Sequence, residues 1–253
     1  MPPDQRPPTT GRVSGWRPGT GPSLEEAAEL LATRELVVEG RLPWSSNLTF
    51  LVTVGDGPLR AVYKPGRGER SLWDFPGGLY RREVAAYALS EALGWGLVPP
   101  TVEVEDGPLG AGSVQLFVDA DYEQHYFTLF ESGDFDCQLR TICVFDVVAN
   151  NADRKSGHVL RSGDGHLWGI DHGLCFHPEP KLRTVMWDYA GDEVPESRLA
   201  DLEGLAGDIP DDLARHLTRE ERHDLVSRIR ALLDTPVFPE PGDDRHPYPW
   251  PLV

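Results

Sequence analysis

The stretch Val148–Phe176 decides the fold that we predict for this chain. It begins Val148-Ala-Asn-Asn-Ala-Asp-Arg-Lys-Ser-Gly-His-Val-Leu160, turns at Asp164-Gly165, and ends Leu167-Trp-Gly-Ile-Asp-His-Gly-Leu-Cys-Phe176. Two acidic residues, Asp153 and Asp171, are 18 positions apart, and each is flanked by apolar residues typical of strands. The Asp-Gly turn between them predicts a β-hairpin that brings both carboxylates to one end of a small sheet.

The residues around this hairpin indicate metal and phosphate chemistry. Two carboxylates beside Asn and His side chains make an oxygen-rich place for a divalent cation. Metal-bound carboxylates near an essential lysine are the working parts of phosphoryl transfer from a nucleotide. The candidate lysine is Lys64, which ends the apolar run Leu59-Arg-Ala-Val-Tyr-Lys64.

Composition and charge narrow the classes of partner. Among 253 residues, 24 are Lys or Arg and 41 are Asp or Glu, which gives a net charge of −17. This balance argues against nucleic acid or an anionic membrane as the main partner. The cysteines are sparse and odd in number (Cys137, Cys143 and Cys175), which indicates a reducing compartment. No stretch approaches the roughly 18 apolar residues of a membrane span, so we expect a soluble cytoplasmic protein.

The N-terminal part predicts one helix followed by an antiparallel sheet. Residues 1–22 are rich in Pro, Gly and Thr, which favours a flexible arm. Ser23 and Glu26 have the spacing of a capping box for a helix over residues 24–33. Strand-like runs follow, with a turn at Asp56-Gly-Pro58, and they predict a β-meander over residues 36–42, 48–54 and 59–64.

Three features of this part are open to two interpretations. The loop Pro43-Trp-Ser-Ser-Asn47 could offer backbone N–H groups to a phosphate, or it is an ordinary hairpin loop. Lys64 is costly in a buried strand unless it is paired, whereas an edge lysine extends its ammonium to water. Glu83, near the start of a predicted helix over residues 80–93, is its possible partner. The alternative is a helix-start glutamate favoured by the helix dipole.

The remaining pattern completes a two-lobed α+β architecture. A strand pair over 101–105 and 112–118 leads to the acidic crossing Asp119-Ala-Asp121, and helices dominate from Asp136 onward, with later ones expected at 196–206, 211–217 and 219–233. We therefore predict an N-terminal lobe of antiparallel sheet plus one helix, a mostly helical C-terminal lobe, and a nucleotide cleft between them. The expected divisions are an arm (1–22), two lobes (23–118 and 119–235) and a Pro-rich tail (236–253).

Five motifs in this order resemble a known family. They are Ala61-Val-Tyr-Lys-Pro65, Arg81-Arg-Glu-Val-Ala-Ala-Tyr87, Gly112-Ser-Val-Gln-Leu-Phe-Val118, Asn150-Asn-Ala-Asp-Arg154 and Gly169-Ile-Asp-His-Gly173. Together they are similar to the phosphatidylinositol 3- and 4-kinase-like superfamily, most nearly the type II phosphatidylinositol 4-kinases, and to an uncharacterised actinobacterial group within it. The resemblance spans residues 36–190 and implies a protein-kinase-like fold.

The resemblance also implies a role for each motif, with ATP and Mg²⁺ or Mn²⁺ as cofactors. Lys64 would bind the α- and β-phosphates and pair with Glu83. Asp153 would orient or deprotonate the phosphoryl acceptor, and Asp171 would hold the metal. Lys155, two residues after Asp153, is instead similar to the lysine of protein kinases that touches the γ-phosphate. The remaining nucleotide contacts would come from a phosphate-covering loop and an adenine-binding hinge, namely Ser45, Ser46, Asn47, Gln115, Leu116, Phe117 and Val118.

The chain departs from the family pattern at three places. His158 stands five residues after Asp153, where a metal-binding Asn is usual, and imidazole suits Mn²⁺ or softer ions better than Mg²⁺. His158 is therefore the second candidate metal ligand; its alternatives are a structural histidine or lost chemistry. The phosphate-covering loop has no glycine, and Asp153-Arg-Lys155 replaces the Asp-Arg-His of the inositol-lipid 3-kinases.

Three functions compete. The first is an ATP-dependent kinase acting on a protein or a soluble small molecule. The second is a phosphatidylinositol kinase, against which stand the acidic charge and the lack of a basic cluster, an amphipathic membrane stretch and a palmitoylation motif. The third is a nucleotide-binding pseudokinase that serves as an interaction module.

Overall fold

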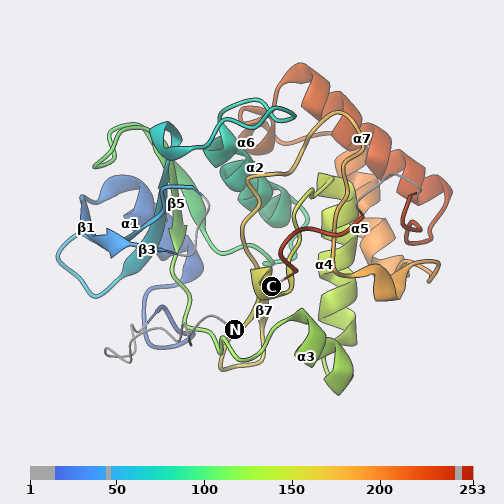
Figure 1. Cartoon of the computed structure of the whole chain (residues 1–253), viewed down its shortest axis with the longest axis horizontal. Coiled ribbons are helices and arrows are strands. Elements are labelled where there is room, and N and C mark those ends of the chain that lie inside the picture. Colours follow the sequence, from blue (N-terminus) through green and yellow to red (C-terminus); the bar gives the residue numbers. More distant parts are fainter. Residues whose placement is uncertain (1–14, 44–46, 243–246, 253) are drawn as a thin grey trace, which may run out of the picture.

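The computed structural model describes residues 15–43, 47–242 and 247–252, which form two lobes (Figure 1). The N-terminal elements are α1 (Leu24–Thr33), β1 (Leu36–Arg41), β2 (Phe50–Val54), β3 (Arg60–Pro65), α2 (Leu79–Ala92), β4 (Thr101–Val104) and β5 (Gly112–Leu116). The later elements are α3 (Tyr126–Ser132), α4 (Asp136–Ala149), β6 (Val159–Arg161), β7 (Leu167–Gly169), α5 (Glu196–Gly207), α6 (Asp211–Ala214) and α7 (Arg219–Asp234).

The first lobe is built on a five-stranded antiparallel sheet in the order β1-β2-β3-β5-β4. β3 lies at its centre, where Lys64 is paired with Ser113 and Ala61 with Leu116. Because side chains alternate along a strand, Ala61 and Tyr63 point to one face of the sheet and Lys64 points to the other. Helix α1 covers the face of Ala61, and its capping box is formed as predicted from Ser23 and Glu26.

Two hydrophobic cores meet at the β6–β7 hairpin. One core joins the sheet to α1, and it includes Leu160 and Trp168 from the hairpin. The other joins α2 to α4, α5 and α7, and it includes Val159 and Leu167 from the same hairpin. The short hairpin thus packs against both lobes, and in Figure 1 it lies between the sheet on the left and the helices on the right. Asp153 precedes this hairpin and Asp171 follows it, so both are held where the lobes meet.

The predicted two-lobed α+β architecture is confirmed, with differences in detail. Helix α3 was not predicted, because its run of aromatic residues does not indicate which side of a helix is buried. In the structure, Tyr126 and Leu129 are its buried residues. The helix expected over residues 211–217 ends at Ala214. Thr218 caps α7 in an extended conformation, and that requires the preceding helix to stop early.

Candidate active site

Lys64 connects the two lobes through two carboxylates. Its ammonium forms an ion pair with Glu83 of α2 and lies 2.9 Å from Oδ1 of Asp171. Burial by itself would lower the pKa of Lys64, but Asp171 and Glu83 outweigh it and raise that pKa above its ordinary value. The Lys64 ammonium in turn holds the pKa of Asp171 well below its usual range. Both groups are therefore charged at neutral pH.

The loop after β7 holds Asp171 in a left-handed backbone conformation, with φ of 61°. Asn150 and Phe176 also have positive φ, and no other non-glycine residue in the described ranges does. Asn150 ends α4, and its side-chain amide donates to the carbonyls of His177 and Glu179. Asn150 is an ordinary left-handed helix cap, whereas strained conformations elsewhere in a chain cluster at active sites.

A buried arginine ties the loops of Asp153 and Asp171 together. Arg154 is fully buried, and its guanidinium forms a bidentate pair with Asp146 of α4 at 2.7 and 2.8 Å. It also donates to the carbonyls of His158 (3.1 Å) and Ile170 (3.0 Å) and lies 2.8 Å from Nε2 of His172. All five N–H donors of the arginine thus have acceptors.

Sequence reasoning assigned no role to Arg154 or Asp146, although a signal was present. Asp146 stands within the apolar helix sequence Ile142-Cys-Val-Phe-Asp-Val-Val148, and a carboxylate on a buried helix needs a cationic partner. The nearest following cation is Arg154. Asn151 adds to the same cluster, because its amide donates to Asp146 at 2.9 Å and its oxygen accepts the Asp153 N–H at 3.0 Å.

Asp153 lies on the accessible side of this cluster. Its carboxylate is 3.2 Å from the Lys155 ammonium. Burial raises the pKa of Asp153 to about 6, with Lys155 opposing that shift and Asp171 adding to it. A carboxylate with this pKa is ionised at neutral pH and is a stronger base than an ordinary aspartate.

His158 faces Asp171 across 3.3 Å, measured from Nε2 to Oδ2. Burial lowers the pKa of His158 to about 4, so the ring is neutral at physiological pH. The Lys155 backbone N–H donates to Nδ1 at 3.4 Å. This places the ring proton on Nε2, directed at Asp171 in the ligand-free site.

The donor set fits a divalent ion that is shared with a nucleotide. No group of three or more His, Cys, Asp and Glu side chains suited to a metal is present in the described parts of the chain. Adjacent ligands of an octahedral Mg²⁺ are about 3 Å apart, given bonds of about 2.1 Å; Asp171 Oδ2 and His158 Nε2 meet that spacing, and His158 can bind through Nε2 only after its ring proton moves to Nδ1. Mg²⁺ commonly takes one or two protein ligands and fills its other positions with phosphate oxygens and water.

A cavity of about 310 Å³ lies at the centre of the candidate site. Lys64, Glu83, Asp153 and Asp171 all line it, together with Asn47 from the loop before β2. The oxygen of the Asn47 side chain accepts the Arg70 N–H at 2.9 Å. Ser45 and Ser46, predicted to cover the phosphates, lie outside the described residues. Lys155 and His158 adjoin the cavity through their contacts with Asp153 and Asp171.

The predicted hinge, Gln115–Val118, lies at the end of β5 where the chain leaves the sheet. The Gln115 side chain donates to Thr101 at 2.9 Å, and the Phe117 N–H donates to the Arg60 carbonyl at 3.0 Å. Arg60 starts β3 and Lys64 lies four residues farther along it, about 13 Å away at 3.3 Å per residue. An extended nucleoside triphosphate separates its base from its terminal phosphates over a comparable distance.

Comparisons with known proteins agree with this architecture. A family model described as phosphatidylinositol 3- and 4-kinase matches residues 75–201, half of the chain. Protein Rv2133c of Mycobacterium tuberculosis is 42% identical over 262 residues, covering 88% of this chain and 94% of that protein. This chain has a kinase-like fold and belongs to the phosphatidylinositol 3- and 4-kinase family.

Two further relatives show how far the likeness extends. Phosphatidylinositol 4-kinase gamma 3 of Arabidopsis thaliana is 32% identical over 141 residues, which cover 43% of this chain and 24% of that protein. A solved structure of hydra Fam20 with sugar superposes with a TM-score of 0.57 at 15% identity, over 83% of this chain and 87% of that one. At such low identity the second likeness supports the fold alone.

Proposed function

We propose that this protein is an ATP-dependent phosphotransferase that transfers the γ-phosphoryl group to a hydroxyl of a protein or a soluble small molecule. The observation that carries this proposal is the meeting of Lys64, Glu83, Asp153 and Asp171 at one cavity lined by both lobes. Lobes over residues 23–118 and 119–235 and a cytoplasmic location are part of the same proposal.

In this proposal residues 115–118, where the chain leaves β5 and crosses to the second lobe, bind the base, and β3 directs the phosphates. Leu116 donates its N–H to the Pro100 carbonyl at 2.8 Å, but Pro100 has no N–H to return to the Leu116 carbonyl. Within the described residues, the Val118 N–H and C=O have no hydrogen-bond partner. A base that pairs with these groups leaves its phosphates near the Lys64 ammonium, with Gln115 and Phe117 beside it.

The chemistry is a direct transfer between oxygens. Asp153 takes the proton of the acceptor hydroxyl as that oxygen bonds to the γ-phosphorus, and the bond from the γ-phosphorus to the β–γ bridging oxygen breaks, releasing ADP. Lys64 offsets the charge of the phosphates, while Glu83 holds its ammonium in place. Lys155 offers a second cation beside Asp153. Mg²⁺ or Mn²⁺ bound at Asp171, with His158 beside it, would neutralise charge on the β- and γ-phosphates.

The test is ATP consumption with Mg²⁺ and with Mn²⁺, followed by transfer from γ-labelled ATP to a fractionated lysate. Lys64→Met and Asp171→Asn are each expected to reduce turnover by at least about 10²-fold, the usual loss when one charge-stabilising group is removed. Asp212→Asn, an exposed carboxylate paired with Arg215 at 3.0 Å, is the matched control and should behave as wild type. Turnover that survives in both site variants would contradict the assignment.

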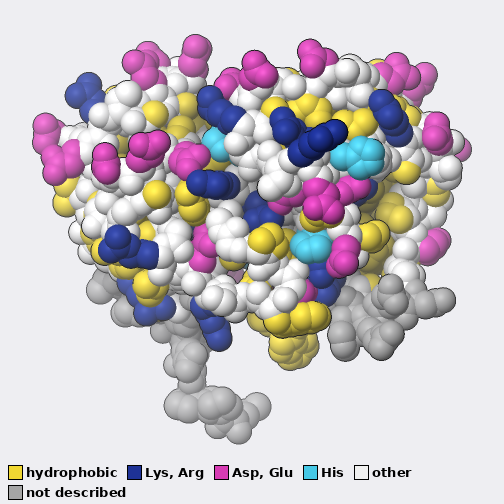
Figure 2. Space-filling model, turned by 90° about the horizontal axis from the view of Figure 1, so that it is seen from above, with side chains coloured by type: hydrophobic (Ala, Val, Ile, Leu, Met, Phe, Trp, Pro, Cys, Tyr) yellow, Lys and Arg dark blue, Asp and Glu magenta, His cyan; other side chains and the backbone are white. Residues whose placement is uncertain are grey.

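A second acceptor, phosphatidylinositol, is favoured by one observation, the name of the Arabidopsis relative that matches 43% of this chain. Against it, Figure 2 shows one face on which acidic side chains lie both around the edge and among scattered Lys and Arg side chains, without a broad basic patch. In the described part of the chain, no helix has the length and apolarity needed to cross a membrane. Labelled phosphatidylinositol vesicles included in the same assay separate the two acceptors. ATP binding without any transfer would instead indicate a pseudokinase.

A further inference from the structure

Residues 15–17, inside the predicted N-terminal arm, pair with residues 117–119, where the chain crosses between the lobes; this segment is called the crossing below. The Trp16 N–H donates to the Phe117 carbonyl at 2.7 Å, and the Asp119 N–H donates to the Trp16 carbonyl at 2.9 Å, as in a short parallel strand pair. The Arg17 guanidinium also lies 2.5 Å from the Asp119 carboxylate. The arm is thus joined to the crossing by three consecutive polar contacts.

Gly15 is the residue that allows this close pairing. A Cβ atom at position 15 would lie 2.5 Å from the Asp119 nitrogen, 2.6 Å from the Val118 carbonyl carbon and 2.8 Å from the Phe117 oxygen. These are backbone atoms and cannot swing aside as the end of a long side chain can. Any larger residue must push the arm away from the crossing.

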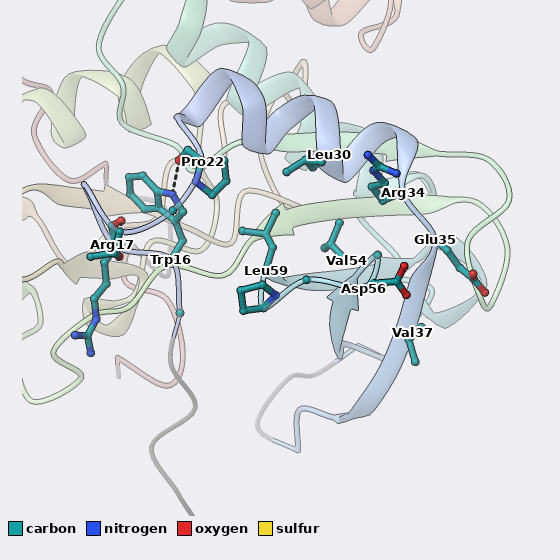
Figure 3. Close-up of a pocket in the computed structure, with 16 residues that line it drawn as sticks. Trp16, Arg17, Pro22, Leu30, Arg34, Glu35, Val37, Val54, Asp56 and Leu59 are labelled. Atoms are coloured by element: carbon teal, nitrogen blue, oxygen red, sulfur yellow. Dashed lines mark hydrogen bonds between the residues drawn. The ribbon is translucent and has the colours of Figure 1, made fainter.

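The indole of Trp16 extends this contact to the second lobe. Its ring lies edge-on to that of Trp168 in β7, with centroids 6.3 Å apart and planes at 86°. Its Nε1 donates to the Pro22 carbonyl at 2.9 Å, and Figure 3 shows the indole beside Pro22 at the end of a cavity that α1 borders through Leu30. Trp168 is three residues before Asp171, so the arm touches both the crossing and the hairpin that leads to the candidate metal residue.

The arm and the proposed base use opposite edges of the crossing. In an extended chain, the N–H and C=O groups of successive residues point to alternate edges. Phe117 and Asp119 use the edge that faces Trp16. Leu116 and Val118 therefore present their backbone groups to the other edge. On that second edge the Leu116 N–H is bound to the Pro100 carbonyl, and residues 15–17 leave the Val118 groups and the Leu116 carbonyl uncontacted.

We infer that Gly15–Arg17 is an interlobe brace and that Trp16 is a positioning residue for nucleotide binding. The inference rests on the proposed function, in which the open edge of the crossing binds the base. The brace holds this edge and the β6–β7 hairpin in the arrangement that fits base and phosphates together. Trp16 itself touches neither the nucleotide nor the acceptor.

The test compares steady-state kinetics of four full-length variants with those of wild type. Trp16→Ala and Gly15→Ala are expected to raise KM for ATP about tenfold with kcat within about twofold, since binding geometry is lost rather than a catalytic group. Trp16→Phe retains an aromatic edge against Trp168 and should stay within about threefold of wild type in KM. Gly57→Ala is the matched control: among the described residues, no atom beyond its own chain neighbours lies within 4 Å of its Cβ position, and Gly57 lines the cavity of Figure 3.

Each outcome decides the inference. If Trp16→Ala and Gly15→Ala lower kcat and leave KM unchanged, the variants only contain fewer folded molecules. If they lower KM for ATP, the arm hinders nucleotide binding. Either result overturns the brace. Amide hydrogen exchange of wild type and Trp16→Ala gives a readout without ATP, and faster exchange is expected both at residues 117–119 and at 167–171. Faster exchange at the crossing alone, or no change, also overturns the brace. Absence of ATP turnover in wild type would reject the proposed function, while the exchange result still decides the brace.

Discussion

Two charged clusters lie beside the loops that contain Asp153 and Asp171, and they differ in their exposure to solvent. In the buried cluster, the side chains of Arg154 and Asp146 are 0% and 1% exposed, and His172 is buried against them. In the open cluster, the side chain of Asp171 is 49% exposed and that of Asp153 is 25% exposed. Both clusters contain cations and carboxylates at hydrogen-bonding distance, but only the open one borders the cavity.

The difference shows how one hairpin serves both stability and chemistry. A buried charge has lost its hydration, so each member of the buried cluster depends on its partners to remain favourable. Members of the open cluster are partly hydrated and can exchange partners. Lys64, for example, is shared between the half-exposed Asp171 and the buried Glu83, so it can exchange Asp171 for a phosphate while it stays paired with Glu83. We therefore expect substitutions in the two clusters to have different effects.

The largest effect is expected for Arg154→Met. Removal of the guanidinium leaves the Asp146 carboxylate buried without a counter-charge, which costs about 3–5 kcal/mol of unfolding free energy. Urea denaturation followed by circular dichroism measures this change. A loss below about 1 kcal/mol, the size of an ordinary substitution, would mean that the buried cluster is not needed for stability.

The double variant Arg154→Met/Asp146→Leu sharpens this prediction and serves as its control. Removing both charges should recover most of the lost stability, because no buried charge is left unpaired. ATP turnover should nevertheless stay low, since the carbonyls of His158 and Ile170 lose the donor that holds the two loops together. Recovery of both stability and turnover would limit Arg154 to a packing role.

An intermediate effect is expected at Asp153, where Asp153→Asn should lower turnover by about 10²–10⁴-fold, the usual contribution of a general base. With its pKa of about 6, the carboxylate is protonated below that pH and cannot accept the acceptor's proton. The rate constant kcat/KM should therefore fall as the pH drops through about 6. A profile over pH 5 to 8 measures this limb.

Lys155→Met is the matched variant for this limb. The Lys155 ammonium, 3.2 Å away, lowers the pKa of Asp153 and opposes the effect of burial. Without that charge the pKa rises, so the acid limb should move to higher pH. A limb at the same pH in wild type and Lys155→Met would exclude Asp153 as its source.

The smallest effect is expected for His158→Asn. If the neutral imidazole joins Asp171 in holding the metal, the wild type favours Mn²⁺ over Mg²⁺ because nitrogen is the softer ligand. The variant should shift this preference toward Mg²⁺ by about tenfold, the lower end of the effects of substitutions around a metal site. A metal titration at neutral pH measures the ratio of the two rates. An identical ratio in both proteins would leave His158 only as a hydrogen-bond donor to Asp171.

Part of the candidate site could be predicted because its signals are local. The alternation of apolar residues around Asp164-Gly165 predicts the hairpin, and the hairpin by itself places Asp153 and Asp171 close together. Lys64 and Glu83 followed from a strand lysine and a helix-start glutamate in an order shared with a known family. The structure brings these residues together around one cavity, while their catalytic roles stay predictions.

Other contacts depend on residues that are far apart in the chain and carry no local pattern. Trp16 pairs with Phe117 and Asp119 across about a hundred positions, from a stretch whose composition favours a flexible arm. Near the other end, the Ser156 N–H donates to the Leu252 carbonyl at 2.9 Å, so the predicted tail lies on the loop after Asp153. Composition describes the freedom of such segments before folding and does not identify what they contact.

The sequence by itself determined the order of strands and helices apart from α3, the turn of the hairpin and the residue types able to bind phosphate and metal. These properties depend on alternation, capping and turn residues, which act over a few positions. The tertiary structure alone decided that Arg154 is buried against Asp146 and that Trp16 joins the crossing to Trp168. Those contacts form only when both cores close on the β6–β7 hairpin, because burial and partner choice depend on the whole fold.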